Sequence, residues 1–281
     1  MKTLVLTQNF PPASGGSGRW FWELYSRLGS DYIVAADEMA NSELFDSHAP
    51  ITIHRLPLYS PQWGVASLQG LKYYWQSFKA LRRIVKEQDI SYIHCGRVLP
   101  EGLMAWMLKK TLGIPYLCYV HGEDLEASAL SRELNSLTKL VMRSADKIIC
   151  NSHNSANIVS RVDDSVNHKV TVMHPGADTN KFYPLENKDE DFLSSMGWNG
   201  KSVILTVGRL QARKGQDKMI EAMPEILKRC PQAHYVIIGH GESRAHLEHL
   251  IESLGLQDHV QMLTDCDDET MIKCYQQCDV F

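Results

Sequence analysis

The chain has 281 residues, of which 44% are hydrophobic and 22% are charged, and its formal net charge at pH 7 is −4. This balance is typical of a globular protein with a sizeable core, and the length predicts about two domains. Because the net charge is slightly negative, the composition favours no nucleic-acid partner. No run of about 18 apolar residues occurs, so we expect no transmembrane helix.

The seven cysteines form no recognisable disulfide or metal-binding pattern. Their number is odd, no Cys-x-x-Cys pair occurs, and several lie in apolar strand-like runs, so we expect buried thiols in a reducing, cytoplasmic setting. His240 and His246 precede Cys274 and Cys278, but this spacing fits a zinc site poorly. We therefore expect no bound metal.

The first part of the chain alternates short apolar runs with longer amphipathic segments. The apolar runs predict strands over 3–7, 32–36, 51–56, 92–95, 116–121, 147–152 and 170–174. Helical patterns lie between them over 18–29, 71–88, 100–113, 131–146 and 152–162. Strands that alternate with helices indicate a parallel sheet covered on both faces, as in an α/β domain.

A polar, proline-containing segment follows, and a second series of the same kind begins after it. We expect a first Rossmann-like domain over 1–182, a linker over 183–200 and a second domain over 201–281. The second series predicts strands over 202–208, 234–239 and 260–263 and helices over 215–229, 242–254 and 268–277. Because the last residues, DVF, look like the start of another strand, we expect this second domain to be incomplete.

The stretch VGRLQARKGQDKMIEAM, residues 207–223, places two cations at an expected strand-to-helix turn. Parallel sheets bind ligands beyond the carboxyl ends of their strands, and Gly208 would let a ligand approach the backbone there. Arg209 offers a planar fork and Lys214 a compact charge, while the following helix directs its first N–H groups at the same place. The pattern indicates a site for two phosphates or, alternatively, a pair of solvated surface cations.

Two further loops follow expected strands in the first domain. FPPASGGSGRW, residues 10–20, contains Gly15 and Gly16 and opens a helix, which suits either a phosphate cradle or a plain turn. YVHGEDLEA, residues 119–127, places His121 and two acids at the end of a strand. This group is either functional or a histidine that caps the edge of the sheet.

The segment LTVGRLQARKGQDKMIEAMPEILKRCPQAHYVIIGHGE, with PPASGG, YVHGED, NSHNSA and HPGADTNKF, resembles the retaining glycosyltransferases of family 4. The resemblance covers the whole chain, and ARKGQDKMIEAMP looks most like the GDP-mannose-using phosphatidylinositol mannosyltransferase branch. It implies the GT-B fold, in which two Rossmann-like domains face a cleft. It also implies transfer of a mannose- or glucose-type hexose from a GDP-sugar or UDP-sugar. The acceptor would be a glycan or lipid-linked molecule in cell-envelope polysaccharide or glycolipid synthesis.

The resemblance also implies roles for individual residues. Arg209 and Lys214 would bind the donor pyrophosphate, and Gly15 and Gly16 would leave room for the distal phosphate. His121 would contact the donor sugar, and Cys266, in LTDCDD, would border the nucleotide base. The two cations and a helix N-terminus would stabilise the charge of the departing nucleotide, so neither a metal nor another cofactor is expected.

One departure from the family pattern leaves other functions open. The family carries two glutamates, which hold the nucleotide ribose and the donor sugar, shortly after the strand that begins at DVF, and this sequence ends at Phe281. The alternative to an active transferase is therefore a catalytically impaired nucleotide-binding or assembly partner. A sugar-nucleotide epimerase is a weaker third possibility, because the Arg209 to Lys214 pattern does not support it.

Residues 71–88 combine aromatic and basic side chains. This mixture is typical of a helix that lies on an anionic membrane, but also of an aromatic stripe that faces the core and leaves a basic face in water. The expected location is the cytoplasm, with or without peripheral contact at the inner face of the cell membrane.

Overall fold

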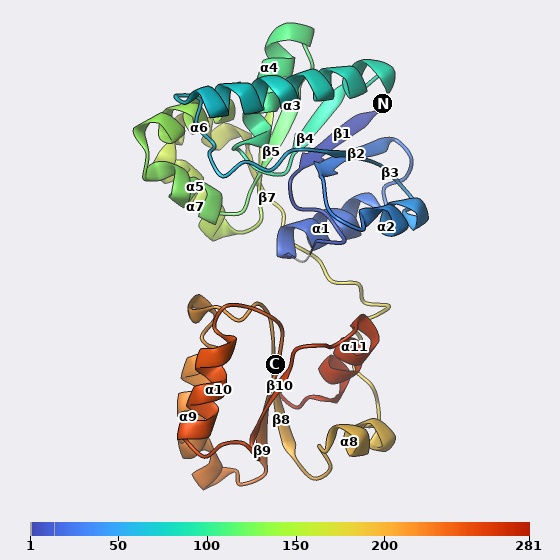
Figure 1. Ribbon diagram of the computed structural model, residues 1–281, viewed down its shortest axis with the longest axis vertical. Coiled ribbons are helices and arrows are strands. Elements are labelled where there is room, and N and C mark those ends of the chain that lie inside the picture. Colours follow the sequence, from blue (N-terminus) through green and yellow to red (C-terminus); the bar gives the residue numbers. More distant parts are fainter. Residues whose placement is uncertain (1, 14) are drawn as a thin grey trace. The chain divides into compact units, whose positions relative to one another are not determined.

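The computed structural model describes residues 2–13 and 15–281, and the chain divides into two compact units, Met1–Gly176 and Ala177–Phe281. Each unit is built around its own parallel sheet, with helices packed against the faces of that sheet (Figure 1). The α/β class and the two separate sheets predicted from the alternation of strands and helices are thus confirmed.

The first unit contains a seven-stranded sheet in the order β3-β2-β1-β4-β5-β6-β7, in which every pairing is parallel. Its strands are β1 (Thr3–Thr7), β2 (Tyr32–Asp37), β3 (Thr52–Leu56), β4 (Tyr92–Cys95), β5 (Tyr116–Val120), β6 (Lys147–Cys150) and β7 (Val170–Val172). Its helices are α1 (Gly16–Tyr25), α2 (Ser42–His48), α3 (Leu68–Glu87), α4 (Glu101–Leu112), α5 (Glu123–Ala129), α6 (Arg132–Ser144) and α7 (His153–Val162), with a 3₁₀ turn η1 (Asp164–Lys169). Because β1 pairs with both β2 and β4, the strand order reverses at β1, and ligands of such sheets bind beyond this point.

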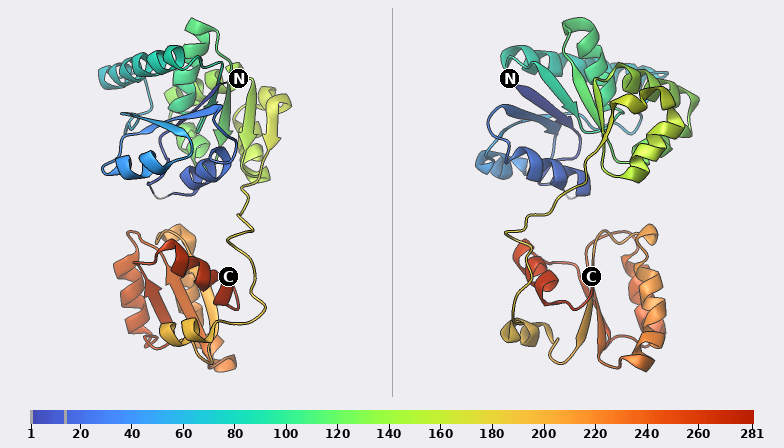
Figure 2. Two further views of the ribbon diagram at one scale, coloured as in Figure 1. Left: turned by 90° about the vertical axis from the view of Figure 1, so that its right-hand side faces the viewer. Right: turned by 180° about the vertical axis from the view of Figure 1, so that it is seen from behind.

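The run TLVLT of β1 shows why the strands are apolar on both sides. Leu4 and Leu6 lie in the core cluster that α3 and α4 cover, whereas Val5 lies in the cluster formed with Phe21 and Tyr25 of α1. The two views in Figure 2 show helices on both faces of this sheet. A strand covered on both faces needs a continuous apolar run, which is what the sequence provides.

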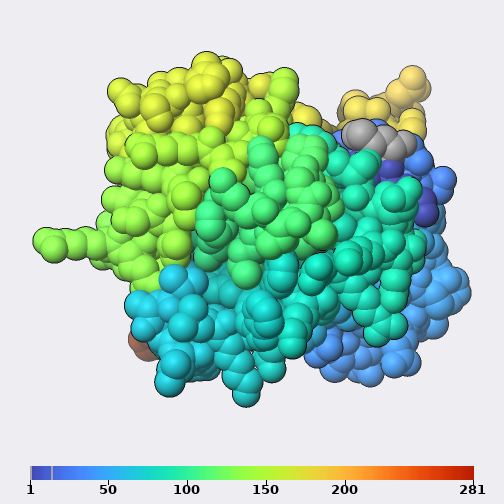
Figure 3. Space-filling view, turned by 90° about the horizontal axis from the view of Figure 1, so that it is seen from above, coloured from blue at the N-terminus to red at the C-terminus, as the bar shows by residue number. Residues whose placement is uncertain are grey.

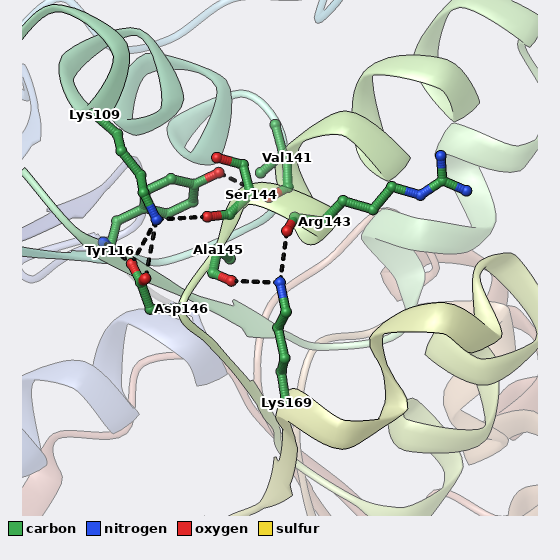
Figure 4. A network of polar contacts seen from close by, with 8 residues as sticks. All are labelled: Lys109, Tyr116, Val141, Arg143, Ser144, Ala145, Asp146 and Lys169. Atoms are coloured by element: carbon green, nitrogen blue, oxygen red, sulfur yellow. Dashed lines mark hydrogen bonds and ion pairs between the residues drawn. The ribbon is translucent and has the colours of Figure 1, made fainter. Parts of the chain in front are cut away.

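The edge of the sheet where β5 and β6 begin is held by lysines that satisfy the carbonyl end of α6 (Figure 4). Lys109 Nζ donates to the Ser144 carbonyl at 2.8 Å and to both Asp146 carboxylate oxygens at 3.0 Å. Lys169 Nζ donates to the Ala145 carbonyl at 2.9 Å. These side chains border a hollow of about 460 Å³. Their ammonium groups supply the hydrogen bonds that the last carbonyls of a helix cannot receive from within the helix.

The second unit repeats the plan with a smaller sheet in the order β10-β9-β8. Its elements are α8 (Glu190–Met196), β8 (Ser202–Val207), a 3₁₀ turn η2 (Ala212–Lys214), α9 (Gln216–Arg229), β9 (Ala233–Ile238), α10 (Arg244–Ser253), β10 (Val260–Leu263) and α11 (Asp268–Gln277). Val280 makes a parallel bridge to Ile204 on the side of β8 away from β9, and its carbonyl accepts from Leu205 N at 2.8 Å. The strand order therefore reverses at β8, as it does at β1.

The segment expected to be a linker, 183–200, is partly folded. Asp189 caps the first turn of α8 by accepting from Phe192 N at 3.0 Å, and Gly197 ends the helix with φ 71°. Leu193 and Trp198 are buried in the core of the second unit. The residues before α8 have no regular structure and those after it form turns, whereas the apolar side chains Leu193 and Trp198 pack into that core.

Candidate functional site

The two cations singled out in the sequence lie in the loop that leaves the carboxyl end of β8. Arg209 follows two residues after the strand, and Lys214 ends the turn η2. Gly215, with φ 74°, then starts α9, and this left-handed conformation favours glycine. The turn directs the first N–H groups of α9 toward the loop, at the point where the strand order of the second sheet reverses.

Both side chains are exposed, and neither makes a hydrogen bond or an ion pair with any residue of 2–13 or 15–281. Other lysines of the region do find partners, such as Lys218, whose Nζ lies 2.9 Å from a carboxylate oxygen of Glu221. Arg209 and Lys214 therefore carry two uncompensated positive charges next to a helix N-terminus. An arrangement of this kind suits a ligand with two phosphates.

The loop is held in place by the neighbouring loop after β9. Gly208 N donates to the Ile238 carbonyl at 2.9 Å, and Leu210 N donates to the His240 carbonyl at 2.8 Å. A Cβ on Gly239 would overlap the carbonyl oxygen of Gly208, and Gly239 also has φ 149°. The two loops approach so closely that only glycine fits, and this contact fixes the backbone that carries Arg209.

A second group of polar side chains lies at the carboxyl edge of the first sheet, around His121. Asp124 Oδ1 accepts from the backbone N–H groups of His121 at 3.3 Å and Gly122 at 3.1 Å. His121 Nε2 lies 3.0 Å from the Gly96 carbonyl. Since a carbonyl only accepts, Nε2 carries the hydrogen and Nδ1 keeps its lone pair. Burial lowers the pKa of His121, so the ring is neutral near pH 7 and Nδ1 can accept a hydrogen bond.

The structure adds Glu101, Gln8 and Arg97 to this group, which sequence reasoning missed. Glu101 is only 1% exposed, and one of its oxygens accepts from Gln8 N at 3.0 Å. Its other oxygen has no hydrogen-bond partner within the part of the chain that the structure describes, and burial raises the pKa of Glu101. Arg97 Nη1 lies 3.4 Å from Gln8 Oε1. Gln8 follows β1 and Arg97 follows β4 closely, so their positions after adjacent strands were a usable signal.

The glycines at the start of α1 differ in their packing. A Cβ on Gly18 would lie 3.0 Å from the Asn9 carbonyl oxygen, so packing within the unit explains this glycine. A Cβ on Gly15 or Gly16 would meet no atom within 4 Å, and the same holds for Gly208. Open space beside a glycine is what contact with a ligand would require, and the roles of these glycines stay predictions.

Cys266 lies between β10 and α11, where its partly buried side chain packs against the core of the second unit. Burial raises the pKa of Cys266, so its thiol is not ionised near pH 7. Its expected place beside a nucleotide base stays a prediction. No three His, Cys, Asp or Glu side chains are grouped so that they could hold a metal ion, as far as the described residues extend. In the same residues, no helix combines the length and the apolar character needed to cross a bilayer.

The chain matches two described families of glycosyltransferases. Residues 14–181 match the family described as Glycosyltransferase Family 4, and residues 188–281 match the one described as Glycosyl transferases group 1. The chain is 25% identical to the GDP-mannose-dependent alpha-(1-6)-phosphatidylinositol monomannoside mannosyltransferase of Mycolicibacterium smegmatis, covering 99% of this chain and 71% of that protein. It is also 25% identical to the GDP-mannose-dependent monoacylated alpha-(1-6)-phosphatidylinositol monomannoside mannosyltransferase of Corynebacterium glutamicum, covering 100% of this chain and 71% of that protein.

Among solved structures, the fold matches Anabaena HepE in complex with UDP and glucose with a TM-score of 0.76. The two sequences are 19% identical, and the match covers 99% of this chain and 72% of that one. At this identity the match shows the fold alone.

Proposed function

The chain belongs to glycosyltransferase family 4, and we propose that it transfers a mannosyl group from GDP-mannose to a glycan or lipid-linked acceptor with retention of configuration. Membership of the family makes it a hexosyltransferase with the GT-B fold that uses a nucleotide-sugar donor. The choice of GDP-mannose is supported by relatives from Mycolicibacterium smegmatis and Corynebacterium glutamicum, whose names specify that donor.

The observation that carries the proposal is the pair of unpartnered cations Arg209 and Lys214 at the start of α9. When the bond between the sugar and the nucleotide breaks, the departing GDP gains negative charge. The Arg209 guanidinium, the Lys214 ammonium and the N–H groups of α9 would stabilise this charge where it develops. Interactions that strengthen in the transition state accelerate the chemical step, so this loop would bind the donor and also speed its cleavage.

His121 has a different role in the proposal. Its neutral ring donates through Nε2 to the Gly96 carbonyl and offers Nδ1 as an acceptor. A donor-sugar hydroxyl would donate to Nδ1 and be fixed in one orientation. Gly15, Gly16 and Gly208 would leave room for the phosphates, and Cys266 would border the base. We propose that two cations suffice for the leaving group, so that the reaction needs no metal.

The experiment is a donor screen with the purified chain. It is incubated with GDP-mannose or UDP-glucose, a membrane lipid extract as acceptor, and either EDTA or magnesium. We expect GDP release that depends on acceptor, is unaffected by EDTA and exceeds UDP release from UDP-glucose. Faster release of UDP from UDP-glucose would refute GDP-mannose as the donor. Binding of GDP-mannose without turnover with any extract would instead identify a nucleotide-binding partner without activity.

A further inference from the structure

One face of the long helix α3 is exposed along its whole length. The side chains on it are Leu68, Leu71, Lys72, Trp75, Lys79, Arg82, Arg83 and Lys86, and all are exposed. At about 100° per residue they fall within an arc of roughly 120°. α3 lies across one side of the first unit in Figure 1, and Figure 3 shows its segment, coloured cyan to teal, at the surface seen from that side. We call these eight residues the α3 face.

The α3 face has an apolar end and a basic end. At its N-terminal end Leu68 is 87% exposed, Leu71 53% and Trp75 54%. At its C-terminal end the side chains that border a shallow hollow of about 240 Å³ are Lys79, Arg82, Arg83 and Lys86. Lys79 Nζ lies 5.0 Å from the centre of the Trp75 ring, which joins the two ends. A leucine pair and a tryptophan in water, followed by a cluster of cations, differ from an ordinary solvated helix face.

The core does not account for these apolar side chains. The buried face of α3 already supplies Tyr74, Phe78, Leu81 and Val85 to the core of the first unit. The aromatic residues of this segment therefore divide, with Tyr74 and Phe78 facing the core and Trp75 facing outward. The single acid of α3, Glu87, pairs with Arg83 at 2.7 Å, so it does not neutralise the other cations.

We propose that the α3 face docks on a bilayer that contains anionic phospholipid, with Leu68, Leu71 and Trp75 inserted among the lipids and the cations on their phosphates. Tryptophan and leucine followed by lysine and arginine are the side chains that suit this interface. Charge complementarity selects the occupant, because the basic end would meet the phosphate groups of the surface while the apolar end lost its contact with water.

The position of the apolar end also indicates the class of acceptor, a step that rests on the proposed function. Tyr73, in the first turns of α3, donates to the Leu58 carbonyl, and Gln8 Nε2 donates to the same carbonyl at 2.6 Å. The apolar end therefore lies beside the loop after β1, which shares Gln8 with the polar group around Glu101. An acceptor carried in the bilayer would reach this edge of the sheet at the inserted end of α3, so the structure assigns a lipid-borne acceptor.

The test measures binding of the full chain to vesicles with no nucleotide present. Vesicles of phosphatidylcholine with phosphatidylglycerol should bind the protein, and pure phosphatidylcholine should bind it weakly. The combined variant Lys79→Gln, Arg82→Gln and Lys86→Gln should bind on the order of 100-fold less tightly at low salt, at about fivefold per cation. The matched control Lys110→Gln, Lys147→Gln and Arg161→Gln removes three exposed cations elsewhere on the first unit and should bind like the wild type.

The fluorescence of Trp75 distinguishes insertion into the bilayer from attraction between charges at its surface. Subtracting the emission spectrum of the Trp75→Phe variant from that of the wild type gives the fluorescence of Trp75. This emission should shift to shorter wavelength when anionic vesicles are added. Leu68→Gln with Leu71→Gln should weaken this shift. Equal vesicle binding by the α3 variant and the matched control would overturn the proposal. So would equally tight binding to a soluble polyanion such as heparin with no Trp75 shift, which would point to an acidic macromolecule.

Transfer is then assayed with GDP-mannose and the acceptor either in vesicles or as a water-soluble glycan. A lipid-borne acceptor predicts that the α3 variant loses transfer to the vesicle acceptor while its calorimetric affinity for GDP-mannose stays unchanged. Transfer to the soluble glycan but not to the vesicle acceptor would refute a lipid-borne acceptor. If the α3 variant loses vesicle binding but neither it nor the wild type uses GDP-mannose, the proposed donor is refuted and the proposed membrane contact of the α3 face is retained.

Discussion

His94 shows how burial sets the charge of a single residue in this protein. Its Nδ1 lies 2.6 Å from the Tyr25 hydroxyl, which in turn lies 2.8 Å from the Tyr119 hydroxyl. Burial lowers the pKa of His94 from 6.5 to about 4. Because the folded pKa lies below the ordinary value, the unfolded chain binds the proton first. The resulting stability is present above about pH 6.5 and is lost as the pH falls toward 4.

We expect acidification from pH 7 to pH 5 to remove roughly 2 kcal/mol of stability through His94 alone. Urea unfolding followed by tryptophan fluorescence at both pH values measures the loss. His94→Gln should be less stable at pH 7 but should show a smaller drop on acidification. The exposed His249→Gln is the control and should keep the wild-type drop. An equal drop in wild type and His94→Gln would show that His94 does not cause it.

Alanine substitutions at Gly16 and Gly208 test contact with a ligand without disturbing the fold. A Cβ at either position meets no atom of the protein within 4 Å, and neither residue has a left-handed φ. Gly16→Ala should leave stability equal or slightly higher, since alanine favours a helix by about 1 kcal/mol over glycine. If phosphates occupy this space, both alanine variants should raise the KM for GDP-mannose at unchanged melting temperature. Unchanged KM in both variants would remove the glycines from the site.

At the scale of elements, the paired loops after β8 and β9 are the part that positions Arg209. Gly239→Ala would place a Cβ against the Gly208 carbonyl, and Gly241→Ala would place one against Leu210. Each should destabilise the second unit by about 2 kcal/mol or more, because backbone cannot yield as a side chain can. Gly200→Ala is the matched control, since its φ of 69° is also left-handed but nothing lies within 4 Å of its Cβ.

Thermal unfolding and donor affinity measured together on these variants separate two outcomes. If the loop pair positions Arg209, Gly239→Ala should lose both stability and GDP-mannose binding. Gly200→Ala should lose less stability and should keep its affinity for GDP-mannose. Wild-type stability in Gly239→Ala would contradict the close approach of the two loops.

Short apolar strands were predicted well from the sequence, whereas short helices were not. The strands over 3–7, 92–95 and 260–263 coincide with β1, β4 and β10. The clearest of them is β1, a fully buried run whose apolar side chains enter the cores on both faces of the sheet. The helices α2, α5 and α8 were not predicted. Each spans only seven residues, which is too short to show a helical period.

The candidate site was predicted in part, for a physical reason. Arg209, Lys214 and His121 follow strands directly, so the rule that ligands bind at the carboxyl ends of strands locates them. Glu101 of the candidate site, and His94 elsewhere in the first unit, were missed because their environment comes from distant partners. Glu101 accepts from a residue 93 positions away, and the partner of His94 is 69 positions away. No local pattern encodes such contacts.

At the scale of the whole molecule, each unit has a core of its own and a polar group at the carboxyl edge of its own sheet. Clusters on both faces of the first sheet belong to residues before Gly176, and those of the second sheet to residues after it. In the second unit, this polar group includes the two unpartnered cations Arg209 and Lys214. If this protein uses a nucleotide sugar as proposed, these two side chains bind its pyrophosphate.

The measurement that tests this most directly is calorimetric titration of GDP-mannose into the wild type, Lys214→Ala and Lys218→Ala. Lys218 is the control, an exposed lysine in the first turn of α9 that already pairs with Glu221. Loss of a charged hydrogen bond to phosphate should weaken binding roughly 10- to 100-fold in Lys214→Ala and abolish transfer, with melting temperature unchanged. Lys218→Ala should bind like the wild type. Equal affinity in Lys214→Ala and the wild type would contradict the central claim.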